Sequence, residues 1–128
     1  MAIFIRMEEK EEMKKTKSKP RVKESVIQKQ ILDYLRYNKF QCWKHRSVGI
    51  FRKDTKHFIP VPIGEKGISD IIGIMNNGTG RLLACEVKAK GGKPTPEQTA
   101  FLDKVNKAGG IGILAYSLDD VINGLKGE

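Results

Sequence analysis

Three charged residues interrupt two otherwise apolar runs of the sequence. The run "ISDIIGIM" (68–75) contains Asp70, and the run "RLLACEVKA" (81–89) contains Glu86 and Lys88. If the two carboxylates lie side by side they repel each other, so something cationic should lie between them. Mg²⁺ or Mn²⁺ would suit that position, because hard cations prefer carboxylate oxygens and leave room for waters and a phosphate oxygen.

Whether the two carboxylates meet depends on the segment "NNGTG" (76–80) between the runs. Its Asn and Gly residues supply the positive φ that a tight turn needs, so the two runs are expected to form a β-hairpin. With 76–80 as the loop, Met75 faces Arg81, and the same register places Asp70 directly opposite Glu86. Directly opposed strand residues have Cβ atoms about 5 Å apart.

An ordinary exposed sheet face is the alternative. Side chains alternate along a strand, so Glu86 and Lys88 point one way, and Cys85 and Val87 point the other way. Alternating polar residues are common in half-exposed strands, where Lys88 would simply reach back to Glu86. The opposed Asp70 weighs against this reading.

The remaining elements must hold this hairpin in a sheet. The patterns predict, in chain order, an amphipathic helix in 22–38, a strand in 40–47, an extended segment in 57–64, the two hairpin strands, a helix in 95–109, a strand in 111–117 and a short helix in 118–125. The second helix carries Thr95 as N-cap, Pro96 at its first position and Gln98 three residues after the cap. This order predicts an α/β fold with a mixed β-sheet flanked by helices.

The chain is long enough for one compact domain. We expect residues 1–20, which are rich in Lys and Glu, to form a flexible charged arm, and residues 21–128 to form the domain. Cys42 and Cys85 lack metal or redox spacing and are expected to be reduced, packed thiols. No apolar run approaches the ~18 residues needed to span a bilayer, so no membrane partner and a cytoplasmic location are expected.

The charge of the chain favours a polyanionic partner. Lys and Arg number 24 against 15 Asp and Glu, a net charge of +9. Such a charge favours nucleic acid as a partner, and the alternative is that it serves only solubility. Basic residues gather between 36 and 56 among Tyr37, Trp43 and Phe51. The candidate DNA contacts are Arg36, Lys44, His45, Arg46, Arg52, Lys53, Lys90 and Lys93. The alternative is a solvated surface with Trp43 in the core, and for Trp43 the core is favoured.

These motifs together resemble a known family. The ordered set "GISD" (67–70), "CEVK" (85–88) and Gln98 resembles the PD-(D/E)XK nuclease superfamily. The preceding "ESVIQKQILDYL" (24–35) and "CWKHRSVG" (42–49) make the chain similar to a stand-alone VRR-NUC domain. Ser69 stands where the superfamily has a proline before the aspartate. The resemblance implies a restriction-endonuclease-like mixed β-sheet with an αβββαβ core.

The resemblance also implies roles for the charged residues. Asp70 and Glu86, with the backbone carbonyl of Val87, would bind Mg²⁺ or Mn²⁺. Lys88 would orient or activate the attacking water and stabilise the charge of the phosphorane. The reaction would be hydrolysis of a phosphodiester, in which a bound metal lowers the pKa of water and neutralises charge on the phosphate.

Two further residues have a catalytic role by resemblance. Glu24 would approach the metal site from the first helix. The alternative is that its carboxylate only stabilises the first turn of the helix through the helix dipole. Gln98 would contact the active site, and its alternative is a capping-box partner for Thr95. Gln28, one turn after Glu24, is a third candidate.

The expected function is that of a divalent-metal-dependent, structure-selective DNA endonuclease, with resolution of Holliday junctions as one such activity. One active site cuts one strand, so a symmetric break needs two sites related by a two-fold axis, which a homodimer provides. The resemblance also implies a substrate, because small stand-alone members of the family are linked to branched DNA in phage and bacterial replication and repair. Two alternatives remain open: a non-catalytic nucleic-acid-binding module that keeps the fold, and a sequence-specific restriction-type endonuclease.

Overall fold

A computed structural model of the chain describes residues 21–46 and 49–128. The elements are α2 (Glu24–Tyr37), β1 (Gln41–Lys44), β2 (Ile50–Arg52), β3 (His57–Ile59), the 3₁₀ turn η1 (Ile63–Glu65), β4 (Ile71–Ile74), β5 (Leu82–Val87), α3 (Pro96–Lys107), β6 (Ile111–Ala115) and α4 (Leu118–Gly124). The predicted arm, residues 1–20, lies outside the described residues. Within the described part, no helix is both long enough and apolar enough to cross a membrane.

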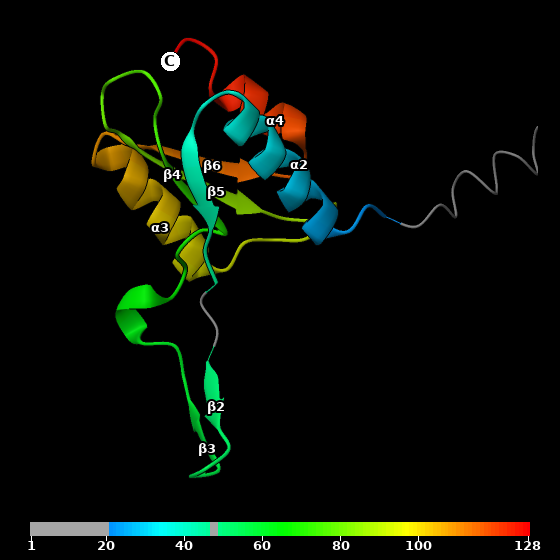
Figure 1. Cartoon of the computed structure of the whole chain (residues 1–128), viewed down its shortest axis with the longest axis vertical. Coiled ribbons are helices and arrows are strands. Elements are labelled where there is room, and N and C mark those ends of the chain that lie inside the picture. The colour runs from blue at the N-terminus through cyan, green and yellow to red at the C-terminus, as the bar shows by residue number, and fades with distance from the viewer. Residues whose placement is uncertain (1–20, 47–48) are drawn as a thin grey trace, which may run out of the picture.

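The main sheet contains four strands in the order β1-β4-β5-β6. The pairs β1/β4 and β4/β5 are antiparallel and β5/β6 is parallel, so the sheet is mixed. Helices α2 and α4 pack on one face and α3 packs on the other (Figure 1). The predicted α/β fold with a mixed sheet and flanking helices is confirmed.

Both faces of β5 are covered, which explains its nearly continuous apolar sequence. Leu83, Cys85 and Val87 belong to the larger core beneath α2 and α4. Ala84 faces the smaller core beneath α3. Because side chains alternate along a strand, Glu86 also points to the α3 face, at the end of this strand.

Trp43 does not lie in the core, and that expectation is wrong. Its side chain is 44% exposed on β1. The physical reason is that β1 is an edge strand, whereas α3 packs over β5 and β6 toward the opposite edge of the sheet. Helix α2 covers the face of β1 that carries Cys42, whereas the face that carries Trp43, on the α3 side of the sheet, has no helix of the described residues above it.

The turn between β4 and β5 closes as its Asn and Gly residues predict. The N–H of Met75 donates to the carbonyl of Arg81 at 2.9 Å. Within the loop, Asn77 Oδ1 accepts hydrogen bonds from both the N–H and the hydroxyl of Thr79. These bonds fix the loop length, and the loop length sets which residues of the two strands face each other.

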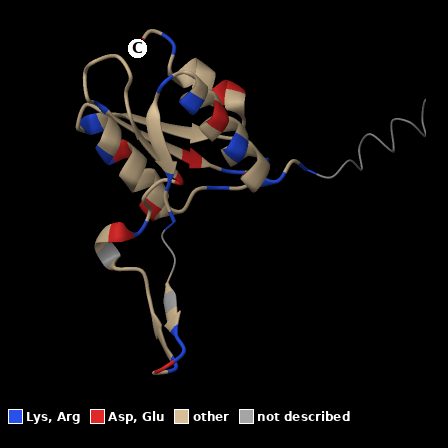
Figure 2. Cartoon of the chain, viewed as in Figure 1, with Lys and Arg blue, Asp and Glu red and all other residues tan. Residues whose placement is uncertain are grey.

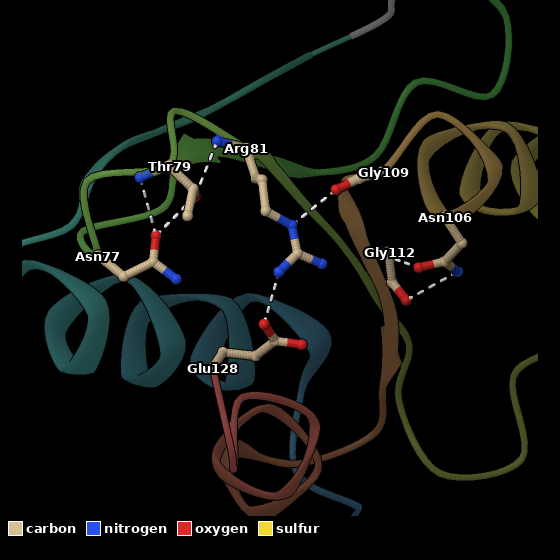
Figure 3. A network of polar contacts seen from close by, with 7 residues as sticks. All are labelled: Asn77, Thr79, Arg81, Asn106, Gly109, Gly112 and Glu128. Atoms are coloured by element: carbon tan, nitrogen blue, oxygen red, sulfur yellow. Dashed lines mark hydrogen bonds and ion pairs between the residues drawn. The ribbon is translucent and has the colours of Figure 1, made fainter.

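A polar network ties the end of this hairpin to the C-terminal part of the chain (Figure 3). Arg81 Nε donates to the carbonyl of Gly109 at 2.6 Å, and Arg81 Nη1 pairs with Glu128 Oε2 at 2.6 Å. The side-chain amide of Asn106 exchanges two hydrogen bonds with the backbone of Gly112. The network lies at the opposite end of β5 from Glu86, so it anchors the strand that presents the candidate site.

A second, two-stranded sheet was not predicted. Strands β2 and β3 form a hairpin that extends away from the main body (Figure 1). The sequence pattern predicts only an extended segment in 57–64. The turn at 53–56 contains no glycine, and Lys56 adopts the positive φ of 54° that glycine usually supplies, so the usual hairpin signal is missing.

Candidate active site

The register of β4 and β5 is the one that the turn predicts. The paired residues are Ile71 with Cys85, Ile72 with Ala84, Gly73 with Leu83 and Ile74 with Leu82. Asp70 directly precedes β4, and the same register carried one residue further sets it opposite Glu86. The two carboxylates therefore belong to the same face of the sheet, next to α3.

Asp70 is held from two sides where the ladder between β4 and β5 ends. Its carbonyl accepts the N–H of His45 at 2.7 Å. Its Oδ2 accepts the N–H of Val87 at 2.9 Å. The last paired residues are Ile71 and Cys85, so the carboxylate of Asp70 occupies the next hydrogen-bonding position on β5. Because the N–H and C=O of one strand residue face the same neighbour, the Val87 carbonyl faces the Asp70 side as well.

Glu86 is a buried carboxylate without a hydrogen bond. Its side chain is 1% exposed, and neither carboxylate oxygen has a hydrogen-bond partner in the described part of the chain. Burial, together with the adjacent charge of Asp70, raises the pKa of Glu86 to about 7, although Lys88 acts in the opposite direction. A buried carboxylate without a hydrogen bond is costly to ionise, and a cation at this position would lower that cost.

Lys88 supplies the nearest positive charge. Its Nζ lies 3.6 Å from Glu86 Oε1, too far for a good hydrogen bond but close enough for an ion pair. The side chain of Lys88 is mostly buried, so solvent screens this charge only weakly. One ammonium stands beside two carboxyl groups, so the cluster has a net negative charge once both carboxyl groups are ionised.

The residues present fit a magnesium or manganese ion. Among residues 21–46 and 49–128, no third His, Cys, Asp or Glu joins Asp70 and Glu86 in a group that could hold a metal. Mg²⁺ is commonly bound by one or two carboxylates and keeps several waters and substrate phosphate oxygens. Two carboxylates and the Val87 carbonyl match that donor set, and they do not match the N and S ligands of zinc.

Gly67 places the segment before Asp70 against the start of α3. Its φ is +84°, and a Cβ at this position would lie 2.4 Å from the backbone carbon and oxygen of Glu97. Only glycine allows this approach, because it has no Cβ and adopts positive φ without strain. The glycine of "GISD" therefore positions the segment before Asp70, a role that no local sequence pattern predicts.

A cavity of about 680 Å³ opens beside Asp70. Two amide side chains line it, Gln28 from α2 and Gln98 from α3. Lys44, His45 and Arg46, which follow one another at the end of β1, line another part of it. The structure thus brings Asp70 together with both predicted glutamines and three predicted DNA contacts.

Gln98 has the structural role that the capping-box alternative predicts. Its Oε1 accepts the N–H of Thr95 at 2.8 Å, and the Thr95 hydroxyl accepts the N–H of Gln98. Because Gln98 also lines the cavity, its contact with a substrate stays a prediction.

Glu24 begins α2 and is half-buried. Within the described part of the chain it does not join Asp70 and Glu86 in a group that could hold a metal. Arg21 Nη1 donates to the carbonyl of Lys90 at 3.1 Å, which holds the start of α2 against the segment that follows Lys88. A catalytic role for Glu24 stays a prediction.

The other basic residues fall into three places. Arg52 and Lys53 belong to the β2–β3 hairpin, and Figure 2 shows basic residues gathered at its far end. Lys90 and Lys93 are exposed in the segment between β5 and α3. Arg36 stands apart, in the last turn of α2 beside the buried thiol of Cys42.

Neither cysteine has the character of a nucleophile. Burial raises the pKa of the Cys85 thiol to about 12, with smaller contributions from nearby carboxylates. Burial likewise raises the pKa of Cys42, although Arg36 acts in the opposite direction. Both thiols are free and buried, as predicted, and both stay protonated at neutral pH.

Neither a scan against models of protein families nor a search of curated proteins finds a match to this chain. The geometry of Asp70, Glu86 and Lys88 therefore provides the support for a function.

Proposed function

We propose that the protein is a divalent-metal-dependent, structure-selective DNA endonuclease with a restriction-endonuclease-like fold, similar to VRR-NUC domains of the PD-(D/E)XK superfamily. One observation carries the proposal: Asp70 and Glu86 are opposed at the end of the β4–β5 ladder, and the Glu86 carboxylate is buried without a hydrogen bond. A structural role alone would not explain two adjacent carboxylates, because their repulsion costs stability.

The two carboxylates and the Val87 carbonyl would bind Mg²⁺ or Mn²⁺. When bound, the ion lowers the pKa of a coordinated water and neutralises charge on the scissile phosphate. The protein supplies the rigidity of the site, since Asp70 is fixed by hydrogen bonds from both Val87 and His45. A metal-binding side chain that is already held in position loses little conformational entropy when the ion binds.

Lys88 acts next to the carboxylates. Its ammonium lies near Glu86, on the strand face that also presents Asp70. There it would orient the attacking water and stabilise the negative charge that develops on the phosphate oxygens. Hydrolysis would form a bond between phosphorus and the water oxygen and break the bond from phosphorus to one sugar oxygen, and a proton from the water would end on that leaving oxygen.

The charge distribution supports DNA as the substrate. Three consecutive residues, Lys44, His45 and Arg46, line the cavity that reaches Asp70, and the chain has a net charge of +9. Basic groups along this approach would bind the phosphates on either side of the cut. Symmetric cutting of a four-way junction would require two copies of this site, and hence a homodimer.

A cleavage assay on branched and linear DNA tests the proposal. Labelled linear duplex, flap and four-way junction are incubated with Mg²⁺ or with EDTA. We expect cleavage only with the metal, and a loss of at least about 100-fold in Asp70→Asn and Lys88→Ala while DNA binding persists. The matched controls are Asp33→Asn and Lys29→Ala, which alter an exposed ion pair on α2.

The two alternatives give different results in the same assay. Binding without cleavage under every metal would contradict the proposal and indicate a non-catalytic binding module. Cleavage of plain duplex at defined sequences would indicate a restriction-type enzyme. Sedimentation of the protein alone and with junction DNA tests the homodimer.

A further inference from the structure

The β2–β3 hairpin exposes two opposed aromatic side chains. Phe51 and Phe58 are directly paired across the strands, and they are 58% and 64% exposed. Opposed strand residues point to the same face with Cβ atoms about 5 Å apart, so both aromatic side chains leave the hairpin on the same face. A single exposed aromatic residue is ordinary, but an opposed pair on a protruding hairpin forms an apolar patch that indicates a binding surface.

The end of this hairpin is basic. Arg52, Lys53 and Lys56 surround the turn, and Asp54 is its one acidic residue. Arg52 Nε lies 3.6 Å from Asp54 Oδ1 at an exposed position, so that charge is partly balanced. Two lysines remain to give the turn a positive charge, and a polyanion complements it.

The aromatic face continues into the candidate active site. Phe58 lines the same cavity as Asp70. A Cβ on Gly49 would lie 2.1 Å from Cζ of Phe58, so the ring lies directly over the backbone of Gly49. One face of the hairpin therefore leads from the cavity, past Phe58 and Phe51, to the lysines of the turn.

We propose that Phe51 and Phe58 form a stacking platform for unpaired bases, with Lys53 and Lys56 holding the phosphates of the same strand. Aromatic side chains stack on the faces of exposed bases, whereas the bases of an intact duplex stack on each other. The proposal rests on the proposed function and deepens it: the substrate is DNA with unpaired bases next to the cleaved bond.

Charge favours DNA over a second copy of the chain on this surface. A second copy placed against the hairpin would bring the same lysines and the same net charge of +9. Like charges brought together at an interface cost free energy, and charged residues are depleted from the cores of such interfaces. A single strand of DNA supplies negative charge that complements the lysines of this hairpin and flat base surfaces that complement its aromatic side chains.

Fluorescence anisotropy in EDTA tests the platform separately from cleavage. One labelled probe is a fully paired duplex, and the other is the same duplex with a short central tract of unpaired thymines. We expect Phe51→Ala/Phe58→Ala to lose about 10-fold or more in affinity for the second probe and less than about 2-fold for the first. Phe51→Trp/Phe58→Trp should retain the preference. The control is Tyr37→Ala, which removes an aromatic residue that is 85% exposed on α2.

The outcomes separate the two proposals. An equal loss on both probes, or no loss, would overturn the platform even if the wild-type protein cleaves DNA. A selective loss in a protein that cleaves nothing under any metal would support the platform and contradict the nuclease. If the wild-type protein sediments as a dimer and the double alanine variant as a monomer, the aromatic pair is a protein interface and the platform is wrong.

Discussion

The carboxylate of Asp70 takes the place that a backbone carbonyl on the β4 side would have in a longer ladder: its Oδ2 accepts the N–H of Val87, on β5, at 2.9 Å. The ladder between β4 and β5 ends at Ile71 and Cys85, and this side chain makes the next hydrogen bond. The bond holds a negative charge next to the buried Glu86 at a fixed position. Removing the charge and removing the hydrogen bond are therefore separate changes with different consequences.

Substitutions at Asp70 should separate stability from cleavage. In Asp70→Asn the side-chain oxygen still accepts from Val87, and the repulsion of Glu86 is gone, so the metal-free protein should be at least as stable as the wild type. Asp70→Ala leaves the Val87 N–H without this acceptor and should cost about 1 to 2 kcal/mol. Both variants should lose cleavage. Urea denaturation in EDTA measures the unfolding free energy of each variant. A larger loss of stability in Asp70→Asn than in Asp70→Ala would contradict this prediction.

The stability of the metal-free protein should fall as the pH rises toward neutrality. The pKa of Glu86 is raised from 4.5 to about 7 in the folded state, first by burial and then by Asp70. Between these values the folded protein holds a proton that the unfolded chain has released, so the contribution is full below pH 4.5 and is lost as the pH passes 7. The loss is on the order of 3 kcal/mol.

Denaturation in EDTA from pH 4.5 to 8.5 measures this contribution. Other groups also titrate in this range, so the comparison is with Glu86→Gln. We expect the difference in unfolding free energy between the wild type and this variant to change across pH 5 to 7.5. A difference that stays constant would show that Glu86 is not the group responsible.

A divalent cation should stabilise the folded protein at pH 8. Binding to the folded state alone adds a free energy that grows with the ratio of free ligand to Kd, about 2.7 kcal/mol at one hundred times Kd. Mg²⁺ or Mn²⁺ should therefore raise the Tm of the wild type and leave that of Asp70→Asn and Glu86→Gln nearly unchanged. Equal shifts in the wild type and both variants would place the ion elsewhere.

Gly67→Ala should damage both folding and cleavage. A Cβ at residue 67 would lie 2.4 Å from the backbone of Glu97, and the φ of +84° is strained for alanine. Gly78→Ala is the matched control, because Gly78 has a φ of +80° with open space around its Cβ position. We expect about 1 kcal/mol of destabilisation in the control and clearly more in Gly67→Ala, with reduced cleavage only in the latter. Similar losses in the two variants would show that the contact with α3 is unimportant.

Local sequence signals predicted the part of the fold that presents the carboxylates. The "NNGTG" turn and the alternation along "ACEVK" depend on neighbouring residues, and together they gave the register that opposes Asp70 to Glu86. The capping box of Thr95 and Gln98 is likewise a local signal, and the structure contains both of its hydrogen bonds.

Features that depend on distant parts of the chain were not predicted. The exposure of Trp43 follows from which strands α3 covers, and no local pattern carries that information. The pairing of Phe51 with Phe58 is local, and it was not predicted for a different reason: its turn lacks the glycine that usually indicates a hairpin. The role of Gly67 depends on the backbone of Glu97, thirty residues further along the chain.

Anomalous diffraction from crystals soaked in Mn²⁺ tests the central claim most directly, because it locates the ion without reference to activity. We predict a peak within about 2 to 2.5 Å of carboxylate oxygens of both Asp70 and Glu86, and no peak there in Asp70→Asn. A wild-type crystal saturated with Mn²⁺ that shows no peak between these two residues would contradict a shared metal site and the nuclease proposal with it.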